Sequence, residues 1–301
     1  CKESEGRKKC FRCHRACGLR EKNISTHSGG KAELIYRGCF KDIDMAITTH
    51  AHMLPFDDYD FVLGNSACTG FIGKTAVFHG KAAHAAGAPH EGVNAMNAAA
   101  LALSALGMIR ETFQEKDYIR VHPIMKEAGS AVNVVPDKAV LDMMVRAGNL
   151  KAVAEVSEKT DRAFRGAAYA IGAEVEITDV PGYLPVIERL PDKVMTEAAG
   201  LLGDSVKWTS ITPGLENMTS TDVGDLTHLM PVLNFTFGGF EGALHSKDFR
   251  LTDAEKAFVL PAKLMALIAY RLLTNQAEEA REILENFTPA LTLEKYLEYI
   301  G

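Results

Sequence analysis

The residues with the most evident chemistry are histidines at the ends of predicted elements. His50 follows the apolar, β-branched run Met45–Thr49, and His245 follows the glycine-containing stretch Gly238–Leu244. His84 lies between a predicted strand and a predicted helix, on a segment of alanines that leaves room for a ligand. Imidazole serves as metal ligand and as general acid or base, and α/β sheets place their ligands at the carboxyl ends of strands. On the residues alone, a partly buried histidine bonded to backbone explains His50 equally well.

Two charged side chains are suited to holding a polar substrate group. Arg146 ends a predicted strand, and its rigid fork of donors fits a carboxylate. Without other information, a solvent-facing arginine at a strand end is the simpler interpretation. Asp222 lies in the segment Thr219–Asp225 and either binds or orients a ligand or caps the helical turn that follows.

Hydrophobic periodicity predicts the elements that position these residues. From Gly70 the chain reads strand, helix, strand, strand, helix, strand, which is the split-βαβ or ferredoxin-like order. Its later members are predicted at 118–124, 139–145, 150–171 and 174–180, after a helix at 93–108. In the flanking regions the pattern predicts a helix start at 29–38, strands at 45–49 and 232–237, and helices at 191–202 and 253–273. The amphipathic tail that ends at Ile300 is expected to pack as another helix. An α/β protein is therefore predicted.

Composition narrows the class of protein. The 301 residues are 47% hydrophobic and 24% charged, as in an ordinary globular chain long enough for two domains. Neither a membrane span nor a secretory pattern is visible, so we expect a cytoplasmic protein without a membrane partner. Residues 1–24 carry a net charge of +5 and the rest −11, which argues against a body that binds nucleic acid.

The first 24 residues form a basic, cysteine-rich head. Cys10, Cys13 and His14 match the covalent haem-attachment pattern, and together with Cys17 they could also hold zinc. A basic zinc knuckle would point to nucleic acid. We favour a disordered, truncated or mistranslated leader, because haem attachment needs export and an axial-ligand pocket, and neither is visible.

Three segments carry a family resemblance: GKAAHAAGAPHEGVNAMNA, SAVNVVPDKAVLDMMVRA and STDVGDLTHLMP. They resemble the zinc amidohydrolases and metallopeptidases of the aminoacylase and glutamate carboxypeptidase family, closest to the p-aminobenzoyl-glutamate hydrolase and β-alanyl-lysine dipeptidase branch. The resemblance covers about Gly29 to Leu273. It implies a three-layer αβα catalytic domain from 25–69 and 183–301, with an inserted ferredoxin-like lid at 70–182 through which the protein forms a homodimer.

The resemblance also implies roles for single residues. His50 and His245 correspond to metal ligands for zinc or another divalent ion such as manganese, and His84 to a group that stabilises the developing oxyanion. Asn133 and Arg146 correspond to residues that bind the carboxylate or amide of a small amide or dipeptide substrate, and Asp222 to the loop that shapes the pocket. In such enzymes zinc activates the attacking water and polarises the carbonyl of the cleaved amide.

The chain departs from this family at its beginning. The family has five protein ligands, two of them in an early His-x-Asp-like segment that is missing before Gly29. Where paired glutamates are expected, Glu21 is the nearby carboxylate, and we assign it the catalytic role. We therefore expect an incomplete copy of the fold, shortened by truncation or a reading-frame error, in which the metal site could stay unoccupied. The alternative function is an inactive relative that dimerises and binds a carboxylate-bearing ligand.

Overall fold

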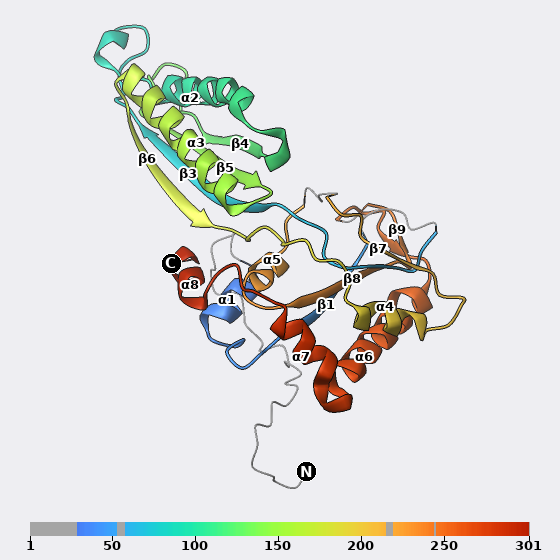
Figure 1. The fold of residues 1–301 in the computed structure, drawn as a ribbon. Coiled ribbons are helices and arrows are strands. Elements are labelled where there is room, and N and C mark those ends of the chain that lie inside the picture. The colour runs from blue at the N-terminus through green and yellow to red at the C-terminus, as the bar shows by residue number, and fades with distance from the viewer. Residues whose placement is uncertain (1–28, 53–57, 215–218, 244, 301) are drawn as a thin grey trace.

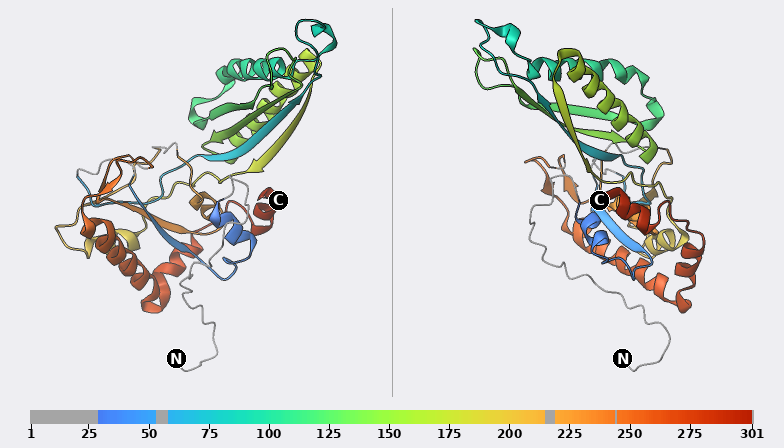
Figure 2. Two further views of the ribbon diagram at one scale, coloured as in Figure 1. Left: turned by 180° about the vertical axis from the view of Figure 1, so that it is seen from behind. Right: turned by 90° about the vertical axis from the view of Figure 1, so that its left-hand side faces the viewer.

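The computed structural model describes residues 29–52, 58–214, 219–243 and 245–300, and two four-stranded sheets dominate them. We call residues 70–181 the lid and the other described residues the body. Figure 1 shows the lid as a separate lobe that is connected to the body, and Figure 2 shows the two parts from two other sides. The head at 1–24, including Glu21, lies outside the described residues.

The lid is an antiparallel sheet with two helices on one face (Figures 1 and 2). Its strands have the spatial order β4-β5-β3-β6. Their bounds are β3 Gly70–His79, β4 Arg120–Glu127, β5 Lys138–Ala147 and β6 Glu174–Pro181, and the helices are α2 Ala95–Ile109 and α3 Leu150–Ile171. This is the split-βαβ arrangement, so the ferredoxin-like fold predicted from the hydrophobic pattern is confirmed.

Strict alternation builds the core of the lid. The buried side chains of β5 are those that face the helices: Ala139, Leu141, Met143 and Val145. Opposite them α2 buries mostly alanines, which let the helix lie close to the sheet. Among the buried polar residues of the lid, Lys74 carries a charge, and its fully buried side chain donates through the ammonium to Asp161 and Asp179. A buried cation needs such partners, because leaving it unpaired would be strongly unfavourable.

The body contains a mixed sheet in the order β1-β8-β2-β7. The strands are β1 Ala46–Ala51, β2 Phe61–Leu63, β7 Trp208–Ser210 and β8 Val232–Phe237. β1 runs parallel to β8, with His50 opposite Thr236, while β2 runs antiparallel to β8. The predicted strand at 45–49 therefore exists, but it extends to Ala51 and includes His50.

Helices lie on both faces of the body sheet. On one face α4 (Lys193–Gly200), α6 (Leu260–Leu273) and α7 (Glu278–Glu285) cover apolar residues of β2 and β8. On the other, α1 (Gly30–Tyr36), α5 (Val223–Thr227) and α8 (Leu293–Ile300) gather around Val232, near the start of β8. The body is thus an α/β layer structure, as expected.

Two predicted helices are wrong in detail. The segment expected as one helix from 253 begins with a π-helix, Glu255–Val259. Pro261 lies just inside α6, and since proline has no N–H, it cannot complete the α-helical hydrogen-bond ladder there. The tail is two helices, α7 and α8, instead of one. A break precedes α7 at Asn275–Ala277, where all three residues have φ between 48° and 60°.

The lid and the body are joined at two close chain crossings. The Phe71 N–H donates to the Tyr183 carbonyl at 2.9 Å, and the Gly182 N–H donates to the Phe71 carbonyl at 3.0 Å. A Cβ at Gly70 would lie 2.4 Å from the Pro185 ring, so glycine is needed for this approach. We call this region, residues 69–71 and 181–185, the hinge.

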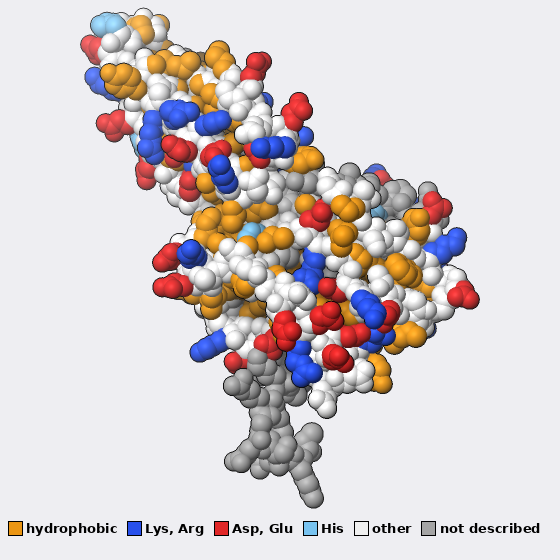
Figure 3. All heavy atoms as spheres, viewed as in Figure 1, with side chains coloured by type: hydrophobic (Ala, Val, Ile, Leu, Met, Phe, Trp, Pro, Cys, Tyr) orange, Lys and Arg blue, Asp and Glu red, His pale blue; other side chains and the backbone are white. Residues whose placement is uncertain are grey.

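Side chains of both charges are interspersed on the face of the molecule in Figure 3. Among the described helices, none alone has the length and apolarity to cross a membrane. Two consecutive helices, Glu255–Leu273 and Asn275–Glu285, are together long and apolar enough to cross a membrane. They are bent by 68° relative to one another, and only their length and composition suggest a span.

Candidate functional site

His50 lies at the carboxyl end of β1 with an exposed ring. Its Nδ1 is 2.7 Å from the Ala51 carbonyl oxygen. Because a carbonyl only accepts, Nδ1 carries the proton and Nε2 keeps its lone pair. A backbone acceptor on one ring nitrogen is how proteins commonly orient a histidine whose other nitrogen binds metal. The geometry therefore supports the ligand role predicted for His50.

His52 has a different environment. Its backbone N–H donates to the Phe237 carbonyl at 2.9 Å, and its ring Nδ1 is 3.1 Å from the Thr236 hydroxyl. Burial lowers the pKa of His52 to about 4, so the ring is neutral near pH 7. We interpret His52 as a residue that fastens the end of β1 to β8.

His245 lies on a short hairpin that follows β8. The hairpin pairs β9 (Phe240–Glu241) with β10 (Arg250–Leu251), and the loop between them carries His245 in an exposed position. Its φ of 63° is in the left-handed region, which is costly for a residue with a side chain and which clusters at functional sites. Gly239 supports the hairpin base, because a Cβ there would lie 2.6 Å from the Asp253 carbonyl oxygen.

His50 lies near the end of β1, and His245 follows β8, the neighbouring parallel strand, so both candidate ligands belong to the carboxyl-end edge of the body sheet. Within residues 29–300, apart from the short undescribed gaps, no group of three His, Cys, Asp or Glu side chains gathers as a metal site would require. Catalytic zinc usually has three protein ligands. The described residues thus offer two imidazoles at this edge of the sheet but no complete metal site.

His84 lies at the end of the lid that is remote from the hinge. β3 runs from Gly70 at the hinge to His79, about 30 Å at the usual rise per residue, and His84 follows it in a bridge with Val134. The His84 Nδ1 accepts from the N–H groups of Ala86 and Gly87 at 3.2 and 3.0 Å. In the neutral ring the proton is therefore on Nε2, which is exposed and ready to donate.

Asn133 is next to His84. The backbone carbonyl of Asn133 accepts from the Ala85 N–H at 2.9 Å. The side chains of Asn133 and His84 are both exposed at the tip of the lid. The structure thus brings these two predicted site residues together.

Arg146 lies at the opposite end of the lid, beside the hinge. β5 is antiparallel to β3, and its register places Arg146 opposite Phe71. Arg146 is consequently separated from His84 by nearly the whole length of the sheet. His84 and Arg146 of one chain therefore do not lie at a common site, because the strand directions put them at opposite ends of the lid.

The guanidinium of Arg146 is held from three sides. Nη1 donates to the Ser220 hydroxyl at 2.6 Å, Nη2 donates to the Met144 sulfur at 3.1 Å, and the group lies 5.1 Å from the centroid of the Phe71 ring. Burial lowers the pKa of Arg146, because the charged form loses hydration. No described carboxylate forms an ion pair with it, so this half-buried cation is available for an anion.

Asp222 does not cap the helical turn that follows it, α5, which was one of its two expected roles. Its carboxylate accepts from the N–H of Lys31 at 3.3 Å and pairs with the Lys31 ammonium, so it caps α1 instead. Asp222 therefore links α1 to the loop beside the hinge.

Asp225 is a buried carboxyl group under this loop that the sequence patterns did not indicate. The residue is 0% exposed and accepts from the Tyr296 hydroxyl of α8 at 3.0 Å. Burial, helped by the nearby negative charge of Asp222, raises the pKa of Asp225 to about 7. Tyr296 and Tyr299 of α8 both interact with the Asp225 carboxyl group. The contact joins residues 71 positions apart, so local patterns do not reveal it.

Asp225 should make stability depend on pH. Its folded pKa exceeds the unfolded value, so the folded state binds the extra proton and loses stability as pH rises from about 4 to about 7, by up to about 4 kcal/mol. We expect Asp225→Asn to remove this loss, so that its melting temperature rises relative to the wild type by several degrees across that window. Scanning calorimetry at several pH values measures it. The exposed Asp204→Asn variant is the control, and equal pH profiles for all three proteins would contradict the expectation.

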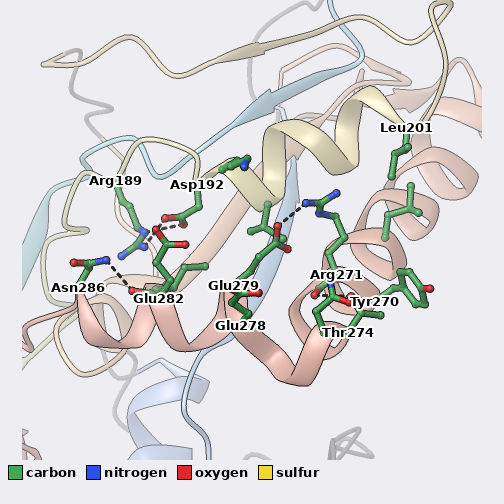
Figure 4. Close-up of a pocket in the computed structure, with 15 residues that line it drawn as sticks. Arg189, Asp192, Leu201, Tyr270, Arg271, Thr274, Glu278, Glu279, Glu282 and Asn286 are labelled. Atoms are coloured by element: carbon green, nitrogen blue, oxygen red, sulfur yellow. Dashed lines mark hydrogen bonds and ion pairs between the residues drawn. The ribbon is translucent and has the colours of Figure 1, made fainter.

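A separate cavity of about 830 Å³ lies between α4, α6 and α7 (Figure 4). Its wall includes Arg271, which pairs with Glu279 and also with Glu197, and Arg189, which pairs with Asp192 at 2.8 Å. None of the candidate residues lines this cavity. Its charges largely neutralise one another, which makes it a structural cluster and not a candidate site.

Comparison with known proteins gives matches in sequence and in fold. Residues 67–171 match the M20-type peptidase dimerisation domain. The chain is 30% identical over 258 residues to the Xaa-Arg dipeptidase of Mus musculus, covering 80% of this chain and 55% of that protein. It is 29% identical over 185 residues to one of the two subunits of p-aminobenzoyl-glutamate hydrolase of Escherichia coli (strain K12), covering 60% of this chain and 36% of that protein.

Two solved structures share the fold. An aminobenzoyl-glutamate utilization protein from Klebsiella pneumoniae superposes with a TM-score of 0.61 at 22% identity, over 80% of this chain and 58% of that one. A dinuclear metal-binding peptidase of the M20 family from Bacillus subtilis gives a TM-score of 0.57 at 20% identity, over 80% and 61%. The chain spans about half the length of the curated mouse relative.

Proposed function

We propose that this chain, which carries the M20 peptidase dimerisation domain, is part of a metal-dependent hydrolase. Its substrate is the amide bond of an N-acyl amino acid, an aminobenzoyl-glutamate or a dipeptide-like molecule. The sequence relatives include a dipeptidase and an aminobenzoyl-glutamate hydrolase, which supports the reaction class. The observation that carries the proposal in this chain is Arg146, a half-buried cation without a described carboxylate partner beside the hinge.

Arg146 would bind the carboxylate that all these substrates share. A guanidinium offers two parallel donors to a carboxylate, and a site sheltered from water strengthens both hydrogen bonds. Binding at the hinge would also place the scissile amide near the edge of the body sheet where β1 and β8 end.

His84 would then act from the second protomer of a homodimer. In its own chain it is about 30 Å from the hinge along β3. A lid that dimerises can present its tip to the body of its partner. There the Nε2 proton of His84 would donate to the oxyanion that forms when the amide is attacked, with Asn133 alongside.

A divalent metal, when bound, would supply an activated nucleophile and polarise the amide carbonyl. His50 and His245 are the residues of the described chain that would hold it, and Glu21 lies outside the described residues. A catalytic zinc site usually has three protein ligands, so these two histidines would need one further donor.

Zinc uptake tests these ligands directly. We expect the full chain to bind zinc and the His50→Ala and His245→Ala variants each to weaken that binding about tenfold or more, in line with the loss of one ligand from a site of three or four. Competition with a chromophoric chelator measures the affinity. The matched control is His90→Ala, an exposed histidine of the lid. If His245→Ala binds zinc like the wild type, His245 is not a ligand.

The second candidate function is an inactive dimer that only binds a carboxylate-bearing ligand, which the incomplete set of described metal ligands favours. Release of p-aminobenzoate from p-aminobenzoyl-glutamate, measured on the zinc- or manganese-loaded chain, separates the two. Turnover that His245→Ala abolishes supports the hydrolase. Binding of the substrate by calorimetry without turnover supports the inactive dimer.

A further inference from the structure

The hydrogen bond between Arg146 and Ser220 connects the lid with the body. Arg146 belongs to β5 of the lid, and Ser220 belongs to a body loop that follows the undescribed residues 215–218. Their 2.6 Å contact is supplemented by a hydroxyl pair, because the Ser220 Oγ is 3.2 Å from the Thr69 Oγ1. Thr69 directly precedes β3 and so lies in the hinge.

Arg146, Ser220, Thr69 and the Thr219 carbonyl form a row of hydrogen bonds. The donor and acceptor in each bond follow from the two end groups, because a guanidinium only donates and a carbonyl only accepts. Thr69 Oγ1 is 3.0 Å from the Thr219 carbonyl oxygen, which can only accept, so the Thr69 proton points there. The Thr69 oxygen must then accept from Ser220, and Ser220 accepts from Arg146, which can only donate. The result is an ordered chain from Arg146 to Ser220, to Thr69 and to the Thr219 carbonyl.

We propose that Ser220 and Thr69 are positioning residues for Arg146, which present its guanidinium to the substrate carboxylate and set the angle of the lid. This inference rests on the proposed function. Arg146 has a long, flexible side chain that loses about 2 kcal/mol of rotamer entropy when it is fixed. The hydroxyl chain, the Met144 sulfur and the Phe71 ring fix it before the ligand arrives, and such preorganisation strengthens binding.

The uncharged nature of Ser220 is essential to this role. A carboxylate at the same place would hold Arg146 but would also neutralise it. The nearby Asp222 is already paired with Lys31. The loop thus anchors the arginine with the uncharged hydroxyl of Ser220 and leaves the charge of Arg146 for the ligand.

The test measures how strongly the full chain prefers a carboxylate. The probes are p-aminobenzoyl-glutamate and its uncharged diamide, titrated by calorimetry, and the readout is the ratio of their dissociation constants. For the wild type we expect a preference of about tenfold or more for the acid, as for a hydrogen-bonded charge pair. Ser220→Ala should reduce this ratio at least about fivefold, Ser220→Thr should keep it within about twofold, and Thr69→Val should give an intermediate loss.

A second variant separates anchoring from charge. Ser220→Asp should hold the lid in place but abolish the preference for the acid. The lid angle is read by pulsed electron resonance between spin labels on non-canonical residues at the exposed positions Ser104 and Lys263. We expect Ser220→Ala to broaden the distance distribution and Ser220→Asp to keep it narrow. A purely structural role would lower the melting temperature of Ser220→Ala without changing the ratio.

The outcomes distinguish the two proposals. If Ser220→Ala keeps the preference while Arg146→Met loses it, the positioning role is wrong and the carboxylate subsite stands. If Arg146→Met keeps the preference, or the wild type shows none, the carboxylate subsite of the proposed function fails, and the positioning role fails with it.

Discussion

Replacing Arg146 by methionine should weaken binding of a carboxylate-bearing ligand by about 10- to 100-fold, the value of a hydrogen bond to a charged group. The structure gives the reason, since the guanidinium is half-buried, fixed by Ser220 and Met144, and has no described carboxylate as a partner. Arg146→Lys should lose most of this affinity, because an ammonium does not reproduce the planar fork. Calorimetric titration with p-aminobenzoyl-glutamate measures both effects.

The stability of the fold should change little in this variant. Burial already disfavours the charged form of Arg146, so an apolar side chain of similar length fits the same place beside Phe71. Arg165→Met serves as the matched control, since Arg165 is an exposed arginine of α3 in the same lid. Equal affinities for the Arg146→Met and Arg165→Met variants would show that Arg146 does not bind the carboxylate.

Much of the lid could be predicted from the sequence because its elements are long and regular. The alternation of Ala139, Leu141, Met143 and Val145 and the 22-residue amphipathic α3 are signals that span many residues. The family resemblance read from the same region is confirmed by the M20-type dimerisation domain match over 67–171. The succession of strands and helices was enough to predict the ferredoxin-like arrangement.

The body was predicted less well because its elements are short or depend on distant contacts. β2 and β7 have three residues each, too few for a periodicity to be visible. The hairpin that carries His245 pairs only two residues per strand and depends on close packing of Gly239 against Asp253. The π-helix ends just before Pro261, whose position near a helix start does not by itself predict a wider turn.

In the candidate site, too, the residues could be selected from the sequence, whereas their positions in space could not. Residue types and family resemblance selected His50, His84, Asn133, Arg146, Asp222 and His245, and their roles remain predictions. Their distribution in space is a property of strand direction, because antiparallel pairing of β3 with β5 sends Arg146 to the hinge while His84 lies at the tip. Asp222 and Asp225 serve contacts with α1 and α8, which no local pattern around residue 222 indicates.

The distance between His84 and the hinge leads to the prediction with the largest effect. If the site combines His50 and His245 of one protomer with His84 of the other, His84→Ala and His245→Ala should each lower turnover by about 10²- to 10³-fold, as expected for loss of an oxyanion donor or a metal ligand. Random mixing of the two variants should nevertheless restore activity. Half of the resulting dimers are mixed, and each mixed dimer holds one intact site, so about a quarter of wild-type turnover should return.

A second mixture of two variants serves as the control for this experiment. In mixed dimers of His50→Ala with His245→Ala, each body lacks one of its own two imidazoles, so no site is intact and activity should stay at the level of the single variants. Exchange of protomers is verified by native mass spectrometry before p-aminobenzoate release is measured. If His84 acted on its own body, the first mixture would be as inactive as the second, because every site would lack either His84 or His245. Recovery in the first mixture alone therefore requires that the tip of one lid completes the site of the other protomer.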